Sequence, residues 1–211
     1  MGERLAGGLK RAGAADSLFV HADVRFEREV AELISAAVKS FGRLDVAVNN
    51  AGTEGRSAPI VGLTATHYAE TLGTNVLGTL LSMKHELRVM QNQGSGAIVN
   101  ITSMFGDKVF PNLALYVASK HAVIGLTRTA ALEAAPVGVR VNAVGPGYIE
   151  TAMFARVTGS PDNQAAATDT VPQGRAGPPE EVADAIMYLA GPQSTYLTGQ
   201  TLFLDGGVKA S

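Results

Sequence analysis

Residues 97–120 read Ala97-Ile-Val-Asn-Ile-Thr-Ser103-Met-Phe-Gly-Asp-Lys-Val-Phe-Pro-Asn-Leu-Ala-Leu-Tyr116-Val-Ala-Ser-Lys120. The apolar run that ends at Ser103 has the length and composition of a buried strand, and the segment from Leu115 to Ala135 is predicted to be a helix. A strand that ends in a hydroxyl, followed by a loop and then by a helix, can bring polar groups to one edge of a sheet. We therefore expect Ser103, Tyr116 and Lys120 to lie together.

The spacing of Tyr116 and Lys120 suggests acid/base chemistry. Side chains four residues apart share one helix face, with about 5–6 Å between their Cβ atoms. An ammonium beside a phenol stabilises the phenolate and would lower the tyrosine pKa from about 10 toward the working pH, as an acid/base catalyst requires. In this arrangement Tyr116 moves a proton, Ser103 hydrogen-bonds the reacting oxygen, and Lys120 tunes the tyrosine. The pair alone is more typical of a solvated helix face than of a catalytic site, so the choice depends on the motifs in the rest of the chain.

The composition excludes several classes of protein. The chain has 211 residues, no cysteine, 46% hydrophobic and 17% charged residues, and a net charge of −2. These values favour one globular domain over residues 1–211, without disulfides, and give no reason to expect a nucleic-acid or membrane partner. No apolar run approaches the ~18 residues of a membrane span, and the N-terminus is charged where a signal peptide is apolar. We therefore expect a cytoplasmic protein. The four histidines lack the spacing of metal ligands, so we expect no metal site.

Strands and helices are predicted to alternate along the chain. The predicted strands are 17–24, 44–49, 97–102, 138–144 and 201–205, and the predicted helices are 3–12, 27–41, 66–90, 115–135 and 179–189. Residues 152–177 are polar, show no clear period and are predicted to be irregular. Such alternation indicates a parallel sheet covered on both faces, in which ligands bind beyond the carboxyl ends of the strands. Polar or glycine-rich clusters stand at four of these ends: Asp23, Asn50 to Gly52, Ser103, and Gly145 to Gly147.

Several motifs follow one another along the chain: Asp23-Val24, Asn49-Asn-Ala-Gly52, Asn75, Ser103, Tyr116-x-x-x-Lys120, Pro146-Gly-x-Ile-x-Thr151, Thr198-Gly199 and Asp205-Gly-Gly207. In this order and at this spacing they resemble the short-chain dehydrogenase/reductase family, and the resemblance covers essentially the whole chain. It implies an α/β fold with a Rossmann-like, doubly wound parallel sheet. It also implies hydride transfer between NAD or NADP and the carbon of an alcohol or carbonyl substrate.

The resemblance implies a role for each motif residue. Tyr116 would be the general acid/base, Ser103 would hold the substrate oxygen, Lys120 would lower the tyrosine pKa and bind the nicotinamide ribose, and Asn75 would anchor a water in a proton relay. The implied cofactor-binding residues are Asp23, Val24, Asn50, Ala51, Gly52, Tyr116, Lys120, Pro146, Gly147, Ile149 and Thr151. Without the family, Asn75 could simply be tolerated in its helix, and the clusters at 50–52 and 146–147 could be plain turns.

The chain departs from the family at its N-terminal side. It contains no glycine-rich turn of the form Thr-Gly-x-x-x-Gly-x-Gly, and the family's first two strands, with the helix between them, have no counterpart. That turn would place backbone N–H groups against the cofactor pyrophosphate, and the second strand would carry the residue that distinguishes NAD from NADP. In the family's strand order, 3-2-1-4-5-6-7, strands 17–24 and 44–49 would then either pair directly or leave two exposed apolar edges.

Two functions therefore compete. The first is an NAD(P)-dependent oxidoreductase acting on a secondary alcohol or ketone, and the second is a catalytically impaired fragment or scaffold subunit with weak or no cofactor binding. The resemblance implies a homo-oligomer, a tetramer or dimer built through helices 66–90 and 115–135. Apolar residues expected near the pocket suggest an apolar or ring-containing substrate, although they are also consistent with loop packing: Met104, Phe105, Phe110, Tyr148, Met153 and Phe154. Residues 152–177 would form a mobile substrate lid.

Overall fold

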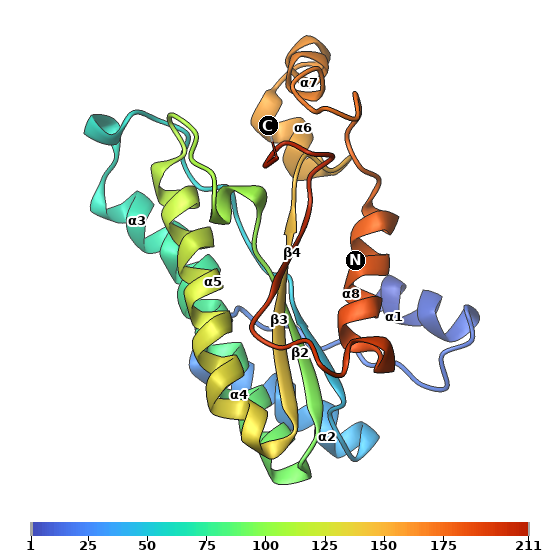
Figure 1. Ribbon diagram of the computed structural model, residues 1–211. Helices are drawn as coiled ribbons and strands as arrows, with labels where there is room; N and C mark the ends of the chain where they lie inside the picture. The colour runs from blue at the N-terminus through green and yellow to red at the C-terminus, as the bar shows by residue number, and fades with distance from the viewer. Residues whose placement is uncertain (1, 211) are drawn as a thin grey trace.

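Four parallel strands form one sheet in the computed structural model, which describes residues 2–210 (Figure 1). They are β1 (Val46–Asn49), β2 (Gly96–Ile101), β3 (Val139–Pro146) and β4 (Thr201–Leu204), and they lie in the order β1-β2-β3-β4. All neighbours pair in parallel, with Val46 opposite Ala97, Ile98 opposite Val141, and Ala143 opposite Thr201. Because all four strands run in one direction, their carboxyl ends meet at one edge.

Helices cover both faces of this sheet, as predicted. In Figure 1 helices α3 (Ala65–Leu72), α4 (Gly78–Gln93) and α5 (Ala114–Ala134) lie on one face, and α8 (Pro179–Ala190) lies on the other. Helix α2 (Glu27–Phe41) packs against α4, and α1 (Gly2–Arg11) precedes it in the chain. The remaining helices, α6 (Ala152–Thr158) and α7 (Pro161–Thr168), stand above the carboxyl edge.

Two apolar clusters hold the layers together because strand side chains alternate between faces. Ile98 and Val141 belong to the cluster formed with α4 and α5, whereas Val99 and Val144 belong to the cluster formed with α8. The strand residues of both clusters are almost fully buried. Strands buried on both faces are typical of a doubly wound α/β sheet.

The segment 17–24, predicted to be a strand, forms no strand, and Val24 already lies in a turn. The expected alternation holds only in part, since Val20, Ala22 and Val24 are partly buried but Leu18, expected on the same face, is exposed. A strand also needs a hydrogen-bonded neighbour, and β1 pairs only with β2 among the described residues. The second of the two expected arrangements therefore holds: β1 is an edge strand, and Val46 and Val48 are each 42% exposed.

Two further predictions need correction. The long helix expected at 66–90 is interrupted by a π-helical turn, Gly73–Leu77, between α3 and α4. The segment 152–177, predicted to be irregular, contains α6 and α7. Neither of these two helices has a fully buried residue, so no hydrophobic period marks them in the sequence. Their starts are set by caps instead, because the hydroxyl oxygens of Thr151 and Ser160 accept hydrogen bonds from the backbone N–H groups of Phe154 and Asn163.

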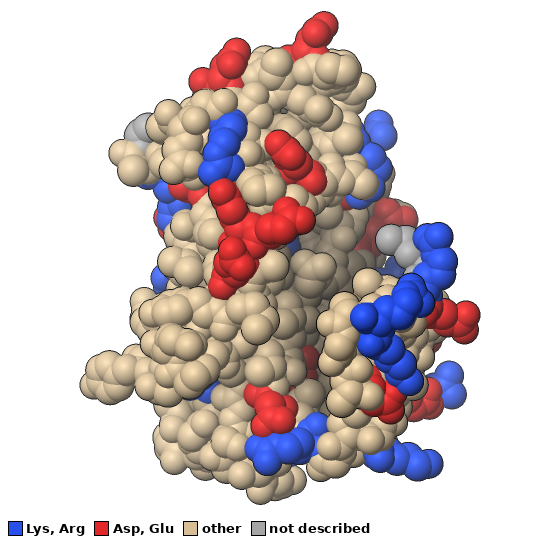
Figure 2. Space-filling model, turned by 90° about the vertical axis from the view of Figure 1, so that its right-hand side faces the viewer, with Lys and Arg blue, Asp and Glu red and all other residues tan. Residues whose placement is uncertain are grey.

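The surface on the α8 side carries charges of both signs. Figure 2 shows acidic side chains gathered near the middle of this face and basic ones toward its right-hand edge. The residues described there form no extended basic surface of the kind that binds nucleic acid. Between residues 2 and 210, no helix is both long enough and apolar enough to cross a membrane.

Candidate active site

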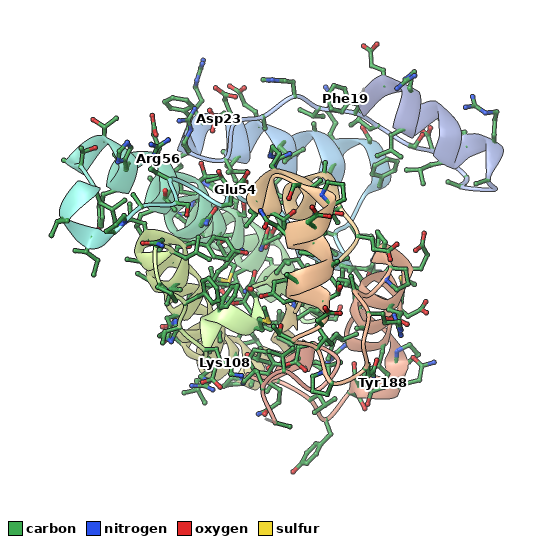
Figure 3. The ribbon with its side chains drawn as sticks, turned by 90° about the horizontal axis from the view of Figure 1, so that it is seen from above. Phe19, Asp23, Glu54, Arg56, Lys108 and Tyr188 are labelled. Carbon is green, nitrogen blue, oxygen red and sulfur yellow. The ribbon has the colours of Figure 1, made fainter. Side chains whose placement is uncertain are left out.

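A cavity of about 650 Å³ lies beyond the carboxyl ends of the strands. Figure 3 looks onto this edge of the sheet from above. The loops that follow β1, β2 and β3 form its floor, and residues of α6 and α8 complete its wall. Most of the lining is apolar, and Met104, Phe105, Tyr148, Met153 and Phe154 contribute to it as expected. Phe110 is the exception: it packs on Phe105, with 5.7 Å between ring centroids, and does not line the cavity.

The cavity brings together Ser103, Tyr116 and Lys120, as the sequence predicted. Ser103 follows β2, and its hydroxyl accepts a hydrogen bond from the backbone N–H of Phe105 at 3.2 Å. Tyr116 lies in the first turn of α5, with Lys120 one turn later. The Lys120 ammonium donates to the Ile101 carbonyl at 2.9 Å and lies 5.6 Å from the centroid of the Tyr116 ring. The end of β2 and one face of α5 therefore place their polar side chains in the same cavity.

The pKa values differ from the expectation that the ammonium lowers the tyrosine pKa. Burial raises the pKa of Tyr116; a hydrogen bond with Ser103 lowers it, and the charge of Glu54 raises it further. Burial also lowers the pKa of Lys120, to about 8. Desolvation is the largest cause of both shifts, since a low dielectric penalises the charged form of each group. Tyr116 is therefore a neutral phenol at pH 7.

Asn75 lies in the π-helical turn, a feature that often marks functional sites. Its side chain is buried and fully engaged: Nδ2 donates to the Thr53 carbonyl at 2.8 Å and to Ser119 Oγ at 2.9 Å, and Oδ1 accepts from the Thr53 N–H at 2.8 Å. A Cβ atom on Gly52 would lie 3.5 Å from Asn75 Oδ1 and 3.6 Å from Lys120 Nζ. Asn75 thus ties the loop after β1 to α5, next to Lys120, and is not merely tolerated in its helix.

Replacing Asn75 by alanine is expected to destabilise the fold by about 2 kcal/mol, because the Thr53 N–H and C=O lose their only side-chain partner in a partly buried loop. Urea denaturation measures this change in the free energy of unfolding. Ser119→Ala keeps both bonds between Asn75 and Thr53 and removes the bond from Asn75 to Ser119, together with the bond from Ser119 Oγ to the Tyr116 carbonyl at 2.7 Å. It is the control, with an expected cost of about 1 kcal/mol. Equal costs for the two variants would contradict the bridging role of Asn75.

Most of the residues expected at the cofactor line the cavity: Asn50, Gly52, Tyr116, Lys120, Pro146, Gly147, Ile149 and Thr151. Ala51 lies between two of them but is exposed. Asp23 and Val24 are not part of the lining. The carboxylate of Asp23 pairs with Arg25 at 2.6 Å, which lowers the pKa of Asp23 to about 2, and Val24 packs on Gly78 of α4. The structure therefore does not bring these two residues into the cavity.

A nicotinamide dinucleotide fits this site in part. The ammonium of Lys120 has three donors, and the Ile101 carbonyl accepts one, which leaves donors for ribose hydroxyls. The apolar wall suits a flat ring, and Gly147 lets the floor pass close to β4, because a Cβ there would lie 2.8 Å from Asp205 Cα. For the pyrophosphate, residues 2–210 offer no glycine-rich turn at a helix N-terminus. The nicotinamide end of the cofactor fits, and the phosphate end lacks its usual cradle.

Sequence reasoning missed Glu54 and Arg156. They form an ion pair at the cavity rim, with Arg156 Nε 2.9 Å from Glu54 Oε1, although 102 residues separate them. Neither residue belongs to a motif, so only the folded chain reveals the pair. No group of three or more His, Asp or Glu side chains that could hold a metal occurs within the described part of the chain.

Comparison with known proteins identifies the family. A family model described as enoyl-(acyl carrier protein) reductase matches residues 2–209. Cis-4-hydroxycyclohexanecarboxylate dehydrogenase of Sinomonas cyclohexanicum is 41% identical over 206 residues, which are 98% of this chain and 82% of that protein. The NAD⁺-bound xylitol dehydrogenase structure has a TM-score of 0.92 at 34% identity, over 98% of this chain and 84% of the other. The structure of ElxO with NADP bound has a TM-score of 0.85 at 40% identity, over 90% and 77%.

These matches confirm the Rossmann-like fold class, with four parallel strands among the described residues in place of the family's longer sheet. They extend over nearly the whole chain, and Ser103, Tyr116, Lys120 and the motif residues from Pro146 to Thr151 lie at the cavity beyond the carboxyl ends of the strands. The chain belongs to the short-chain dehydrogenase/reductase family, a family of NAD(P)-dependent oxidoreductases.

Proposed function

We propose that this chain transfers a hydride between a nicotinamide cofactor, NAD or NADP, and a secondary alcohol or ketone, with Tyr116 as the general acid/base. The observation that carries the proposal is the convergence of Ser103, Tyr116 and Lys120 on one apolar cavity. Relatives whose names describe dehydrogenases, and solved structures described as binding NAD⁺ or NADP, support it.

The residues divide the chemistry between them. The cofactor, when bound, supplies or accepts the hydride at the reacting carbon. Ser103 donates a hydrogen bond to the substrate oxygen, and Tyr116 gives that oxygen a proton in reduction or takes it in oxidation. Lys120 holds the ribose hydroxyls next to the phenol. Asn75 keeps the loop at Gly52 and the lysine in place, and its part in a water relay remains a proposal.

The substrate is proposed to be apolar or ring-containing. The lining combines aromatic and aliphatic side chains with only two charged groups, Glu54 and Lys120. Binding a charged group against such a wall costs desolvation without compensation. Residues 152–177 would act as the substrate lid of a single domain over residues 1–211, because α6 supplies part of the wall.

We also propose a cytoplasmic homo-oligomer, a dimer or tetramer. Large apolar side chains are exposed along the helices on one face of the sheet, among them Tyr68, Leu80 and Leu132. Burying such groups against a second copy removes apolar surface from water. Light scattering on the purified chain gives the mass that tests this.

A second candidate function, a scaffold subunit without turnover, is favoured by one observation. The edge of β1 is exposed, and the described residues beside it provide no phosphate cradle. Cofactor affinity is then weak, and the protein acts through its surfaces alone.

A turnover assay distinguishes the oxidoreductase from the scaffold subunit. The chain is incubated with NAD⁺ or NADP⁺ and a panel of cyclic and acyclic secondary alcohols, or with the reduced cofactors and the matching ketones, and absorbance of the reduced nicotinamide is followed. We expect ring-containing substrates to turn over. Absence of turnover at saturating cofactor with every substrate would support the scaffold.

A further inference from the structure

Two hydrogen bonds join the cavity floor to the helix that covers it. Arg156 Nε donates to Glu54 Oε1 at 2.9 Å, and Arg156 Nη2 donates to Glu54 Oε2 at 3.3 Å. Glu54 lies in the loop after β1 and lines the cavity, whereas Arg156 lies in α6. In Figure 3 Glu54 is seen beside this helix, at the edge of the sheet that carries the site. A two-point contact of this kind fixes orientation as well as distance.

Helix α6 makes few buried contacts with the rest of the protein. None of its seven residues is fully buried, so it contributes no side chain to either apolar cluster. Its apolar residues Met153, Phe154 and Val157 line the cavity, and the Phe154 ring lies 5.3 Å from that of Tyr148. A segment with few buried contacts opens at low cost. The bond from Arg156 to Glu54 is therefore one of the contacts that keep α6 over the cavity.

The ion pair between Glu54 and Arg156 also affects the electrostatic environment of the Tyr116 phenol. Glu54 is the acidic residue of the lining, and its charge raises the pKa of Tyr116. The other polar groups that face Tyr116 are Ser103, which lowers its pKa by a hydrogen bond, and the Lys120 ammonium on its own helix. Arg156 neutralises Glu54 and lowers the pKa of that carboxyl. When α6 moves away, the Glu54 carboxylate faces the phenol without its counter-ion.

We propose that Glu54 and Arg156 form an electrostatic latch, which holds α6 over the cavity and neutralises the Glu54 carboxylate next to Tyr116 when the cavity is closed. The inference rests on the proposed function of the cavity, and it makes both residues positioning residues. An open latch presents a negative rim, which disfavours carboxylate-bearing substrates and raises the energy of the phenolate. A closed latch weakens both effects, although the Glu54 charge still raises the pKa of Tyr116 when the pair is formed.

Closure is tested by hydrogen exchange at residues 152–158 of the full chain. Arg156→Gln and Glu54→Gln are each expected to speed exchange there about two- to fivefold, the range of an exposed ion pair. Arg175→Gln is the matched control, because it removes a similarly exposed pair with Glu181, at 2.6 Å, that is not part of this cavity. Exchange at 152–158 that is unchanged in both latch variants, or equally fast in the control, overturns the latch.

The charge effect is tested by titrating Tyr116 through phenolate absorbance, after subtracting the curve of Tyr116→Phe. Arg156→Gln is expected to raise the midpoint by about half a pH unit, and Glu54→Gln to lower it by a similar amount. The double variant removes both charges and is expected to titrate close to the parent, because the two opposite effects then cancel. Shifts of the same sign in both single variants, or no shift, contradict the proposal. Neither test needs cofactor or turnover, so failure of the latch and failure of the proposed reaction are told apart.

Discussion

Replacing Tyr116 by phenylalanine is expected to lower kcat by about 10²–10⁴-fold, the usual contribution of a positioned acid/base group. The ring and its packing stay, since phenylalanine preserves the edge contact with Phe105 at 6.5 Å between centroids. Only the hydroxyl that exchanges the proton with the substrate oxygen is lost. Steady-state kinetics on a substrate found by the panel measures the change.

Two controls sharpen the Tyr116 result. Tyr196→Phe changes a fully exposed tyrosine and is expected to leave kcat unchanged. Dinucleotide binding by Tyr116→Phe is expected to stay within about threefold of the parent, because a loss confined to chemistry lowers kcat more than affinity. A Tyr116→Phe protein that keeps more than about a tenth of the parent kcat would remove Tyr116 from the acid/base role.

The raised pKa of Tyr116 also sets the direction of the pH dependence. The phenol stays protonated around pH 7, so it can donate a proton, and carbonyl reduction is expected to proceed at neutral pH. Alcohol oxidation needs the phenolate, and its rate is expected to rise as the pH increases toward the tyrosine pKa. Because the Glu54 charge raises that pKa, Glu54→Gln is expected to shift the rise to lower pH.

Replacing Glu86 by glutamine is expected to remove a pH dependence of stability worth about 3 kcal/mol. Glu86 is buried in α4, and Asn49 Nδ2 donates to it at 3.0 Å. Burial raises the pKa of Glu86 from 4.5 to about 7, and the bond from Asn49 lowers it only in part. Between these two values the unfolded chain loses the proton while the folded chain keeps it. The free energy of unfolding therefore falls as the pH rises from about 4.5 to about 7, and this loss is complete above pH 7.

Urea denaturation of the parent and Glu86→Gln at pH 5 and pH 8 measures the effect. We compare the pH 5 to pH 8 difference and not the absolute stabilities, because the glutamine amide adds donors of its own. Glu133→Gln, at an exposed site of α5, is expected to keep the parental pH dependence. A Glu86→Gln profile parallel to that of the parent would show that Glu86 is ionised in the native state without penalty.

The grouping of Ser103, Tyr116 and Lys120 could be predicted from the sequence, because it depends on helix spacing and on the parallel order of the strands. Ser103 ends an apolar strand, and Tyr116 and Lys120 share one helix face, so their meeting at the carboxyl edge follows from spacing and parallel topology. The alternation of strands and helices gave the α/β class for the same reason. The chemistry of Lys120 was not predictable in this way, because burial of both groups reverses the expected direction of the tyrosine pKa shift.

What the sequence could not show depends on contacts between distant segments. Segment 17–24 has the side-chain alternation of a strand, but strand formation requires a neighbour that β1 does not provide. Helices α6 and α7 bury no residue fully, so they carry no periodic signal. In the sequence, Glu54 and Arg156 cannot be told from ordinary surface charges. Only the fold places Arg156 Nε 2.9 Å from Glu54 Oε1.

Binding of NADH and NADPH, followed by nicotinamide fluorescence, tests most directly whether this cavity is the cofactor and substrate site. We expect saturable binding of at least one dinucleotide by the parent chain, and weak binding because residues 2–210 provide no phosphate cradle. We expect at least about tenfold weaker binding by Lys120→Met, which loses the charged donors to the ribose, and unchanged binding by Arg175→Gln. No saturable binding of either dinucleotide, or equal binding by the parent and Lys120→Met, would contradict the assignment of this cavity as the cofactor and substrate site.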